Sequence, residues 1–352
     1  MDTNSDIVFD RRGAAGVVTL NRPQALNAVT HAMVRTLAHK LDAWRHDDAV
    51  TRIVVTATGE RAFSAGGDIR ALYDLGRGGR HAEALAFWRE EYALNTAIKC
   101  YPKPYVALID GIVMGGGVGL SVHGSHRVAG DRFLFAMPEV GIGFFPDVGG
   151  TWFLPRLPGE VGAFCALTGD RLKAADGVAL GVATHRVSSA RFADLLDALC
   201  GNVPVDAVLA AFGEPAGEGP VMVRRAAIDR LFAADRVEDI LARLDREVAG
   251  GGIDAAWAAS TAATIRTRAP TSPKVALAQV RRGKDWSFEE CMRAEFRIVS
   301  RIVYDHDFYE GVRAAVIDKD NAPQWRPATL AEVDDAEVER HFAALERDLV
   351  LP

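Results

Sequence analysis

The sequence has little cysteine, and its cysteines follow no pairing pattern. Cys100, Cys165, Cys200 and Cys291 are scattered over 352 residues, and none lies in a Cys-x-x-Cys spacing. A zinc site or a redox motif needs closely spaced cysteines, and a disulfide framework belongs to small, cysteine-dense chains. The pattern therefore argues against a metal site or a disulfide scaffold, and it fits a reducing compartment.

Long apolar runs and an excess of positive charge are also missing. No run approaches the ~18 apolar residues that a membrane-spanning helix needs. The first six residues are polar and acidic, so we expect no secretory signal and a cytoplasmic protein. The net charge of -6 disfavours non-specific binding to nucleic acids or membrane surfaces. We therefore expect neither as a partner.

The overall composition is that of a globular protein, and the sequence pattern differs between its two parts. The chain is 49% hydrophobic and 25% charged, which is ordinary for a folded domain. Strand-like runs alternate with helical ones in residues 1–201, whereas helical periodicity dominates residues 202–352. In the second part, Ser272-Pro273 is typical of a helix N-cap, and Ser287 to Glu290 fits a capping box. We predict a mixed α/β core followed by a helical C-terminal region.

The α/β prediction depends on repeated strand, turn and helix patterns. A hairpin is expected over residues 7–20, and fully apolar runs at residues 53–57 and 105–109 predict buried parallel strands. Apolar residues at helical spacing predict helices over residues 27–45 and 81–98. This alternation is typical of parallel βα units.

Two glycine-rich turns each follow one of these strands. Gly66-Gly67 and Gly115-Gly116-Gly117 precede predicted helices, the second of which should run through His123. Glycine lets a ligand approach the backbone, and a helix start offers free N–H groups. Two such turns on adjacent strands would form an oxyanion hole, worth roughly 3 kcal/mol per donor. A purely structural role for the glycines stays open, whereas the spacing fits neither a dinucleotide site nor a P-loop.

Two carboxylates lie in an otherwise apolar stretch, residues 137–150. Glu139 and Asp147 are surrounded there by glycine, proline, valine and phenylalanine. Burial would raise the pKa of both carboxyls into the range useful for acid–base chemistry. Two simpler interpretations remain: Asp147 caps a helix that begins near Val148, and Glu139 is a solvated loop acid.

Several motifs, in order along the chain, resemble one superfamily. They are Asn21-Arg22-Pro23, Leu26-Asn27-Ala28, Phe63-Ser64-Ala65-Gly66-Gly67-Asp68-Ile69, Lys103-Pro104, Gly111 and Gly115-Gly116-Gly117. Over residues 6–187 the chain resembles the enoyl-CoA hydratase/isomerase (crotonase) superfamily. The resemblance implies a crotonase-like ββα spiral core, a coenzyme A thioester as substrate, and an oxyanion hole made by the N–H groups of Gly67 and Gly116.

Further motifs resemble one branch of that superfamily, whose members hydrolyse 3-hydroxyisobutyryl-CoA. They are Arg89-Glu90-Glu91-Tyr92, residues 114–124, the stretch from Glu139 to Asp147, residues 308–314 and residues 318–320. By this resemblance Glu139 and Asp147 are catalytic. Glu91, Asp68, Phe144 and Phe145 are expected around the acyl group, although adjacent phenylalanines are also common in a plain core. Expected coenzyme A contacts are Arg22, Ala25, Leu26, Ser64, Ala65, Ile69 and Lys319, with Arg22 and Lys319 facing phosphates.

One position departs from the hydratase pattern. Hydratases of the superfamily carry two catalytic glutamates, and Gly119 stands where the first would be, twenty positions before Glu139. Because glycine cannot hold or activate water, we expect thioester hydrolysis instead. Glu139 would attack the carbonyl carbon or act as a general base on water, and Asp147 would bind the 3-hydroxyl or relay a proton.

The expected enzyme uses no metal and no cofactor beyond the coenzyme A of its substrate. The branch suggests a place in valine catabolism, and the superfamily suggests a homo-oligomer, trimer or hexamer. Two alternatives stay open. One is an isomerase or hydratase of the same superfamily, and the other is a non-catalytic relative that binds coenzyme A or RNA.

Overall fold

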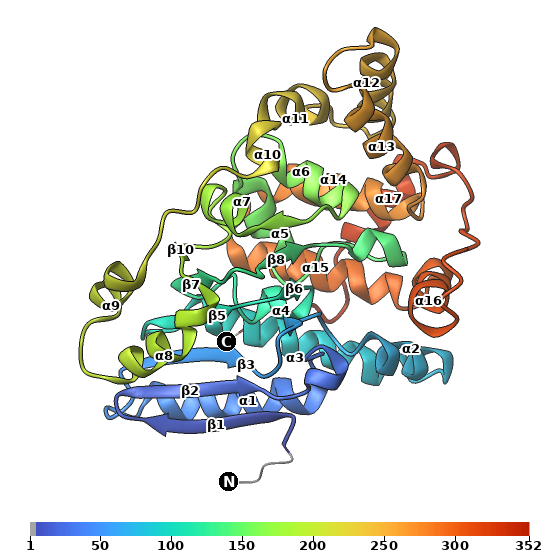
Figure 1. Cartoon of the computed structure of the whole chain (residues 1–352). Coiled ribbons are helices and arrows are strands. Elements are labelled where there is room, and N and C mark those ends of the chain that lie inside the picture. Colours follow the sequence, from blue (N-terminus) through green and yellow to red (C-terminus); the bar gives the residue numbers. More distant parts are fainter. Residues whose placement is uncertain (1–4, 352) are drawn as a thin grey trace.

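Two β-sheets, surrounded by helices, form the core of the protein, whose computed structural model describes residues 5–351 (Figure 1). The larger sheet has the order β1 (Ile7–Arg12), β2 (Ala15–Leu20), β3 (Arg52–Ala57), β5 (Tyr105–Ile109), β7 (His126–Ala129) and β10 (His185–Arg186). The smaller sheet has the order β4 (Ala62–Ser64), β6 (Ile112–Met114), β8 (Leu134–Ala136) and β9 (Leu172–Lys173).

The chain passes repeatedly from the larger sheet to the smaller one. β3 leads to β4, β5 leads to β6, and β7 leads to β8. Within each sheet these strands pair in parallel, while β1 and β2 form the predicted antiparallel hairpin. The predicted ββα spiral is therefore present. Because β4 and β6 are parallel neighbours, the glycine turns that follow them leave the smaller sheet at the same edge.

The first part of the chain supplies the helices that pack around these sheets. They are α1 (His31–Arg45), α2 (Ile69–Arg77), α3 (His81–Lys99), α4 (Gly116–Gly119), α5 (Gly150–Phe153), α6 (Val161–Thr168), α7 (Ala174–Ala179) and α8 (Phe192–Cys200). Helix α1 begins where the Thr30 side chain accepts a hydrogen bond from the Met33 N–H. Helix α3 buries Glu91 and Asn95 on the same face as apolar side chains such as Trp88. This polar content of a buried face marks α3 as part of a site.

One predicted helix is much shorter than expected. Helix α4 ends at Gly119, so the prediction of a helix that continues through His123 is wrong. Glycine is a poor helix former, and α4 contains three glycines in its four residues. The chain continues in turns, and the Ser121 hydroxyl donates to the Gly117 carbonyl.

The second part of the chain is helical, as predicted. Its helices are α9 (Val205–Phe212), α10 (Pro220–Val223), α11 (Arg225–Phe232), α12 (Val237–Gly250), α13 (Ala255–Arg266), α14 (Thr271–Gly283), α15 (Phe288–Ile302), α16 (His306–Val312) and α17 (Asp335–Phe342). The capping box at Ser287 is confirmed. The N-cap at Ser272 is wrong, because α14 already begins at Thr271. Pro273 lies in its first turn, where an N–H has no intrahelical partner.

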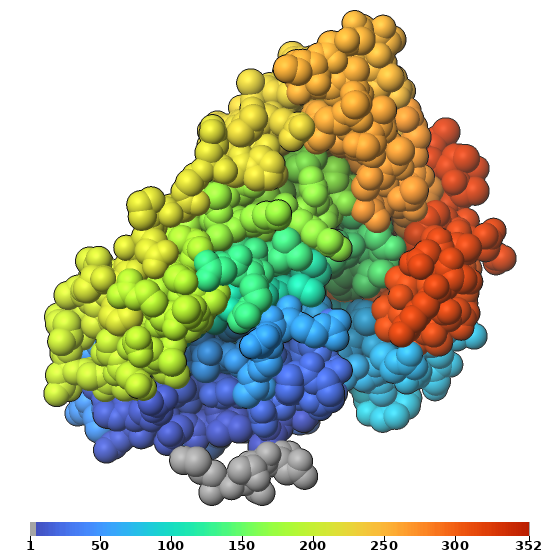
Figure 2. All heavy atoms as spheres, in the orientation of Figure 1, coloured from blue at the N-terminus to red at the C-terminus, as the bar shows by residue number. Residues whose placement is uncertain are grey.

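The two parts share one hydrophobic core. Buried residues from Val18 in β2 to Val338 in α17 belong to a single apolar cluster. Helix α15 contacts α3 and α5, and α14 contacts α6, so the C-terminal helices pack directly on the spiral. Figure 2 shows the yellow and orange C-terminal helices at the end of the molecule opposite the blue N-terminal hairpin. The division at residue 201 stays a prediction. None of the helices in residues 5–351 has the length and apolar character needed to cross a membrane.

Candidate active site

The two glycine turns touch each other at the edge of the smaller sheet. Gly66 has a φ of +113° and Gly115 a φ of +45°, conformations that favour glycine. A Cβ placed on Gly116 would lie 3.2 Å from the Gly67 nitrogen. Within residues 5–351 neither the Gly67 nor the Gly116 N–H donates a hydrogen bond. Two free N–H groups thus lie close together, as an oxyanion hole requires.

Carboxyl groups surround these turns. Glu139 begins a short 3-10 helix (η2, Glu139–Ile142), and its Oε1 would lie 3.4 Å from a Cβ on Gly115. The Glu91 Oε1, from α3, would lie 2.6 Å from a Cβ on Gly116. Asp147 is also buried, and Glu295 on α15 is completely so. No lysine or arginine of the described chain pairs with any of these four acids. They therefore form a buried acidic cluster without a cation.

Burial and mutual repulsion raise the pKa values of this acidic cluster. Burial raises the pKa of Glu139 well above its ordinary range, and the nearby Asp147 raises it further. The same two causes act on the pKa of Glu91. Burial raises the pKa of Asp147 to about 7, although a hydrogen bond from the Tyr92 hydroxyl at 2.9 Å opposes the shift. The pKa of Glu295 is raised to about 8, again mainly by burial. Asp147 and Glu295, with pKa values of about 7 and about 8, exchange protons near neutrality.

Several polar atoms of the site have no hydrogen-bond partner among residues 5–351. They are the Glu91 Oε1, the Glu139 Oε2 and both amide atoms of Asn95. Buried polar atoms are normally paired, and an unpaired one costs about 1–3 kcal/mol. Asn95 lies one helical turn after Glu91, so α3 presents both to the same space. A polar ligand here would supply the missing partners.

Gly119 packs closely against the Asn95 side chain and Val148. A Cβ at this position would meet the Asn95 Nδ2 at 2.6 Å and the Val148 Cβ at 3.0 Å. A second glutamate here would require the Asn95 side chain to move and Val148 to shift slightly. In this structure the Asn95 amide fills the space beside Gly119.

The simpler interpretations of the two acids are wrong. Helix α5 begins at Gly150, and no side chain caps its N-terminus from Gly149. Asp147 instead accepts the Tyr92 hydroxyl, so it is not a helix cap. Glu139 is 7% exposed, and is not a solvated loop acid.

Phe144 and Phe145 are both buried close to the acids. Phe144 stacks on Trp88 with ring centroids 5.7 Å apart and packs against Phe308 at 5.5 Å. These contacts make Phe144 part of an aromatic cluster that joins α3 to α16. A role of either ring in walling the acyl pocket stays a prediction.

The predicted coenzyme A contacts lie on two segments that meet beside the first glycine turn. The Ala65 N–H donates to the Leu26 carbonyl, and the Ser64 hydroxyl accepts from the Gly66 N–H. The remaining members of these segments, Ala25 and Ile69, are partly buried. The structure thus brings these residues together next to the proposed oxyanion hole.

The two predicted phosphate partners differ. The Arg22 guanidinium pairs with Asp68 at 3.1 Å and with Asp6 at 3.4 Å, so its charge is already balanced. Asp68 also accepts from the Ala71 N–H as the N-cap of α2, which gives it a structural role. Lys319 is exposed, with a φ of +59°, and forms no ion pair within residues 5–351. Of the two cations, Lys319 is the one available to a phosphate.

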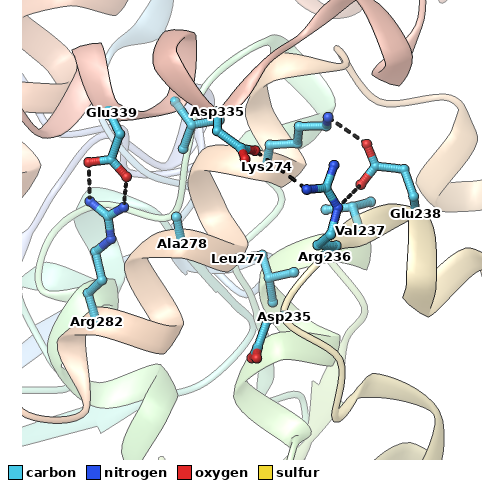
Figure 3. Close-up of a pocket in the computed structure, with 11 residues that line it drawn as sticks. Asp235, Arg236, Val237, Glu238, Lys274, Leu277, Ala278, Arg282, Asp335 and Glu339 are labelled. Carbon is cyan, nitrogen blue, oxygen red and sulfur yellow. Dashed lines mark hydrogen bonds and ion pairs between the residues drawn. The ribbon is translucent and has the colours of Figure 1, made fainter.

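A surface cavity in the C-terminal region contains none of these residues (Figure 3). It lies between α12, α14 and α17. Its cations pair with its acids: Lys274 with Glu238 at 2.5 Å, and Arg282 with Glu339. Because these charges neutralise each other, the cavity offers no evident anion site.

One group in the described chain has the residue types of a metal site, namely Asp305, Glu337 and His341. The Arg340 guanidinium pairs with both acids, at 3.2 Å from Asp305 and 2.7 Å from Glu337. An internal cation thus already occupies this group.

Sequence reasoning missed three polar neighbours of the site: Tyr92, Asn95 and Glu295. The spacing of Glu91 and Asn95, four residues apart, is a helical signal that could have paired them. Glu295 carries no comparable signal, because its hydrogen-bond partners Gly149 and Thr151 precede it in sequence by 146 and 144 positions.

Comparisons with known proteins place this geometry in context. The family described as enoyl-CoA hydratase/isomerase matches residues 15–342. A 3-hydroxyisobutyryl-CoA hydrolase of Danio rerio is 46% identical, over 99% of this chain and 92% of the relative. The Homo sapiens protein of the same name is 41% identical, over 98% and 90%. Both names specify mitochondria, which contradicts the prediction of a cytoplasmic protein.

Two similar solved structures share the fold of this chain but are described as other enzymes than the hydrolases above. A carnitinyl-CoA dehydratase from Mycobacterium thermoresistibile is 43% identical with a TM-score of 0.93, over 99% of both chains. An enoyl-CoA hydratase from Rhodobacter sphaeroides is 39% identical with a TM-score of 0.91, over 99% of this chain and 100% of that one. The predicted crotonase-like fold with its helical C-terminal region is confirmed.

Proposed function

The chain belongs to the enoyl-CoA hydratase/isomerase family, and we propose that it is an acyl-CoA thioester hydrolase that converts 3-hydroxyisobutyryl-CoA to 3-hydroxyisobutyrate and coenzyme A. Curated 3-hydroxyisobutyryl-CoA hydrolases that are 41–46% identical over nearly the whole chain support this activity. The observation that carries the mechanism is the buried Glu139 beside the glycine turns, together with Gly119 at the position where the hydratase pattern has its other glutamate.

The glycine turns polarise the thioester. The carbonyl oxygen accepts hydrogen bonds from the N–H groups of Gly67 and Gly116, which have no other acceptor in the described chain. As the carbon becomes tetrahedral, this oxygen gains negative charge, and each donor stabilises it by roughly 3 kcal/mol. Both groups belong to the backbone, so they need no reorganisation during the reaction.

Glu139 acts on the acyl carbon either directly or through water. In one route its carboxylate oxygen bonds to the acyl carbon, the C–S bond breaks, and the coenzyme A thiolate leaves. Water then opens the mixed anhydride, which releases the acid and restores Glu139. In the other route Glu139 takes a proton from water, the water oxygen bonds to the acyl carbon, and the C–S bond breaks so that the coenzyme A thiolate leaves. Both routes need Glu139, and neither needs a carboxylate at position 119.

Asp147, held by Tyr92, protonates the leaving thiolate and binds the substrate 3-hydroxyl. A carboxyl with a pKa of about 7 is partly protonated at neutral pH, so Asp147 can protonate the leaving thiolate. Its Oδ2 is held by the Tyr92 hydroxyl, which leaves the other oxygen for the substrate 3-hydroxyl. A buried polar group placed to hydrogen-bond a substrate hydroxyl discriminates strongly against an analogue without that hydroxyl.

The wider setting follows from the same proposal. The reaction belongs to valine catabolism, and the enzyme needs no cofactor beyond the coenzyme A of its substrate. We expect a homo-oligomer, trimer or hexamer, and no nucleic-acid partner, in keeping with the net charge of -6.

Hydration or dehydration is the second candidate, because two similar structures are described as a hydratase and a dehydratase. Both reactions add or remove water across a double bond, which in this superfamily uses two glutamates. The Asn95 amide fills the space beside Gly119 and cannot replace a carboxylate as a base. An isomerase, which needs one acid–base carboxylate, is the other family alternative.

A panel of coenzyme A thioesters distinguishes these activities. The substrates are 3-hydroxyisobutyryl-CoA, isobutyryl-CoA, a 2-enoyl-CoA and a 3-enoyl-CoA, each followed by free thiol release and by absorbance of the conjugated double bond. We expect rapid thiol release from the first substrate and at least tenfold slower release from the second. Conversion of an enoyl-CoA without thiol release would instead support hydration or isomerisation, and binding without any product would support a non-catalytic relative.

A further inference from the structure

The loop that carries Asp147 is held in a strained conformation. Val148 has a φ of +50°, a left-handed conformation that a β-branched residue rarely adopts, and Gly149 follows with a φ of +89°. Backbone of this kind is energetically unfavourable and persists only where the surroundings fix it. The surroundings of this loop must therefore supply specific anchors.

Three side chains provide these anchors. The Glu295 Oε2 accepts from the Gly149 N–H at 2.8 Å, and its Oε1 accepts from the Thr151 N–H at 2.9 Å. The Gln279 Nε2 donates to the Pro146 carbonyl at 2.6 Å. The His123 Nε2 donates to the Val148 carbonyl at 2.7 Å. The loop is thus held immediately before and after Asp147.

Two of these anchors come from the C-terminal helical region. Glu295 lies on α15 and Gln279 on α14, and both are 0% exposed. Figure 1 shows α14 and α15 lying beside α5, the short helix that follows the loop, and contacts of α5 with both helices agree. The region that supplies no predicted catalytic residue therefore determines where Asp147 lies.

We infer that Glu295 and Gln279 are positioning residues of the hydrolase: they hold the 146–151 loop so that Asp147 faces the Tyr92 hydroxyl and the thioester. The inference rests on the proposed function for the reaction, and on the hydrogen bonds for the geometry. Neither residue bonds to the glycine turns, so each acts on the reaction through the loop.

A carboxylate at position 295 is specifically suited to this role. Two N–H groups point to its two oxygens, so both oxygens must accept. Glutamine can accept from only one of them, and its amide would face the other N–H donor. A buried acid is costly unless it is paired or hydrogen-bonded. Because Glu295 has no basic partner in the described chain, the two loop N–H groups are what stabilise it there.

Glu295 also contributes charge to the site. The groups that respond to it electrostatically are Glu91, Tyr92, Glu139 and Cys291, and Asp147 in turn raises the pKa of Glu295. Glu295 becomes ionised as the pH approaches its pKa of about 8, and its charge then raises the pKa of Glu139. Replacing Glu295 by a neutral residue should therefore lower the pKa of Glu139. Glu139 must be ionised to act, so the acidic limb of the kcat/KM profile should move to lower pH. A residue that served only stability would leave this limb in place.

The experiment compares Glu295→Gln and Gln279→Met with the wild-type chain, using 3-hydroxyisobutyryl-CoA and thiol release over pH 5 to 9. For Glu295→Gln we expect kcat to fall at least tenfold, KM to change less than threefold, and the acidic limb to move down. For Gln279→Met we expect a fall in kcat with no shift of the limb, because a neutral group has been removed. Glu289→Gln, on the same helix and outside the hydrogen bonds of the loop, is the matched control and should behave as wild type.

The outcomes separate the two ideas. A wild-type chain that releases no thiol from any substrate overturns the proposed function. An active wild type with unchanged kcat and pH profile in Glu295→Gln overturns the positioning role and leaves the hydrolase intact. Should Glu295→Gln fail to fold, Glu295→Asp provides the test, since it keeps the charge but shortens the reach. We then expect a lower kcat with the acidic limb near its wild-type position, and a wild-type kcat would overturn the inference.

Discussion

The spiral core and the C-terminal helices build the active site in different ways. The core contributes Gly67, Gly116 and Glu139 from turns that directly follow strands of one sheet. The C-terminal region contributes Glu295 and Gln279, whose hydrogen bonds reach across more than a hundred residues. The reacting groups thus lie close in sequence to the strands that position them. The loop that carries Asp147, in contrast, is held by helices distant in sequence.

Charge distinguishes the two regions as well. The acidic cluster of the core contains Glu91, Glu139, Asp147 and the incoming Glu295 without a cation, so its pKa values are raised. In the C-terminal cavity of Figure 3, cations and acids pair instead. Strongly shifted pKa values cluster at reactive sites. Exposed ion pairs, in contrast, usually contribute little to stability. Functional effects should therefore concentrate in the core and in its two anchors.

The largest effect is expected from Glu139→Gln. The amide can neither attack the thioester nor accept a proton, so kcat should fall roughly a thousandfold. The measurement is thiol release from 3-hydroxyisobutyryl-CoA under saturating conditions, with circular dichroism to check the fold. Turnover within threefold of wild type would remove Glu139 from the mechanism and would weaken the contrast between core and C-terminal region.

The next largest effect is expected from Gly116→Ala. The new Cβ would lie 2.6 Å from the Glu91 Oε1 and 3.2 Å from the Gly67 nitrogen, so the methyl group displaces the acid and crowds the other oxyanion donor. Loss of one such donor typically lowers kcat about a hundredfold. The matched control is Gly250→Ala in α12, where nothing lies within 4 Å of the added methyl group. Equal kcat values for the two variants would contradict the predicted oxyanion hole.

A smaller effect concerns stability and pH. The pKa of Asp147 rises from an ordinary 3.8 to about 7 on folding, so between these values the folded chain keeps a proton that the unfolded chain releases. The free energy of unfolding should therefore fall as pH increases through this window. In Asp147→Asn this part of the slope should vanish, as urea unfolding at pH 5, 6 and 7 would reveal. Identical slopes in both proteins would mean that Asp147 does not titrate in the folded chain as proposed.

The smallest effect is expected in the C-terminal cavity. Arg282→Ala removes a partly exposed ion pair with Glu339 and a contact with the Phe342 ring, which together should cost no more than ~1 kcal/mol of unfolding free energy. Turnover and KM should stay at their wild-type values. Glu339→Gln removes the same ion pair from the other side and should agree. A marked loss of activity in either variant would make the cavity part of the site.

The sequence by itself predicted the reactive groups and the long parallel strands, but not the short strands β4 and β6 that lead directly into the glycine turns. Fully apolar runs predicted the parallel strands β3 and β5, because a strand buried on both faces must be apolar throughout. The glycines after β4 and β6 predicted where a carbonyl oxygen could approach the backbone. Gly119 indicated that the glutamate pair of a hydratase is incomplete, since an absent side chain is visible without any structure.

Only the tertiary structure decided how these groups are aligned. The burial of Glu91, the link from Tyr92 to Asp147, the position of the Asn95 amide beside Gly119 and the hold of Glu295 on the loop all join segments distant in sequence. A pattern of neighbours cannot encode such contacts, because they arise when helices pack on an already formed sheet. The strained Val148 illustrates the reason: its conformation is unfavourable locally and exists because distant hydrogen bonds compensate for it.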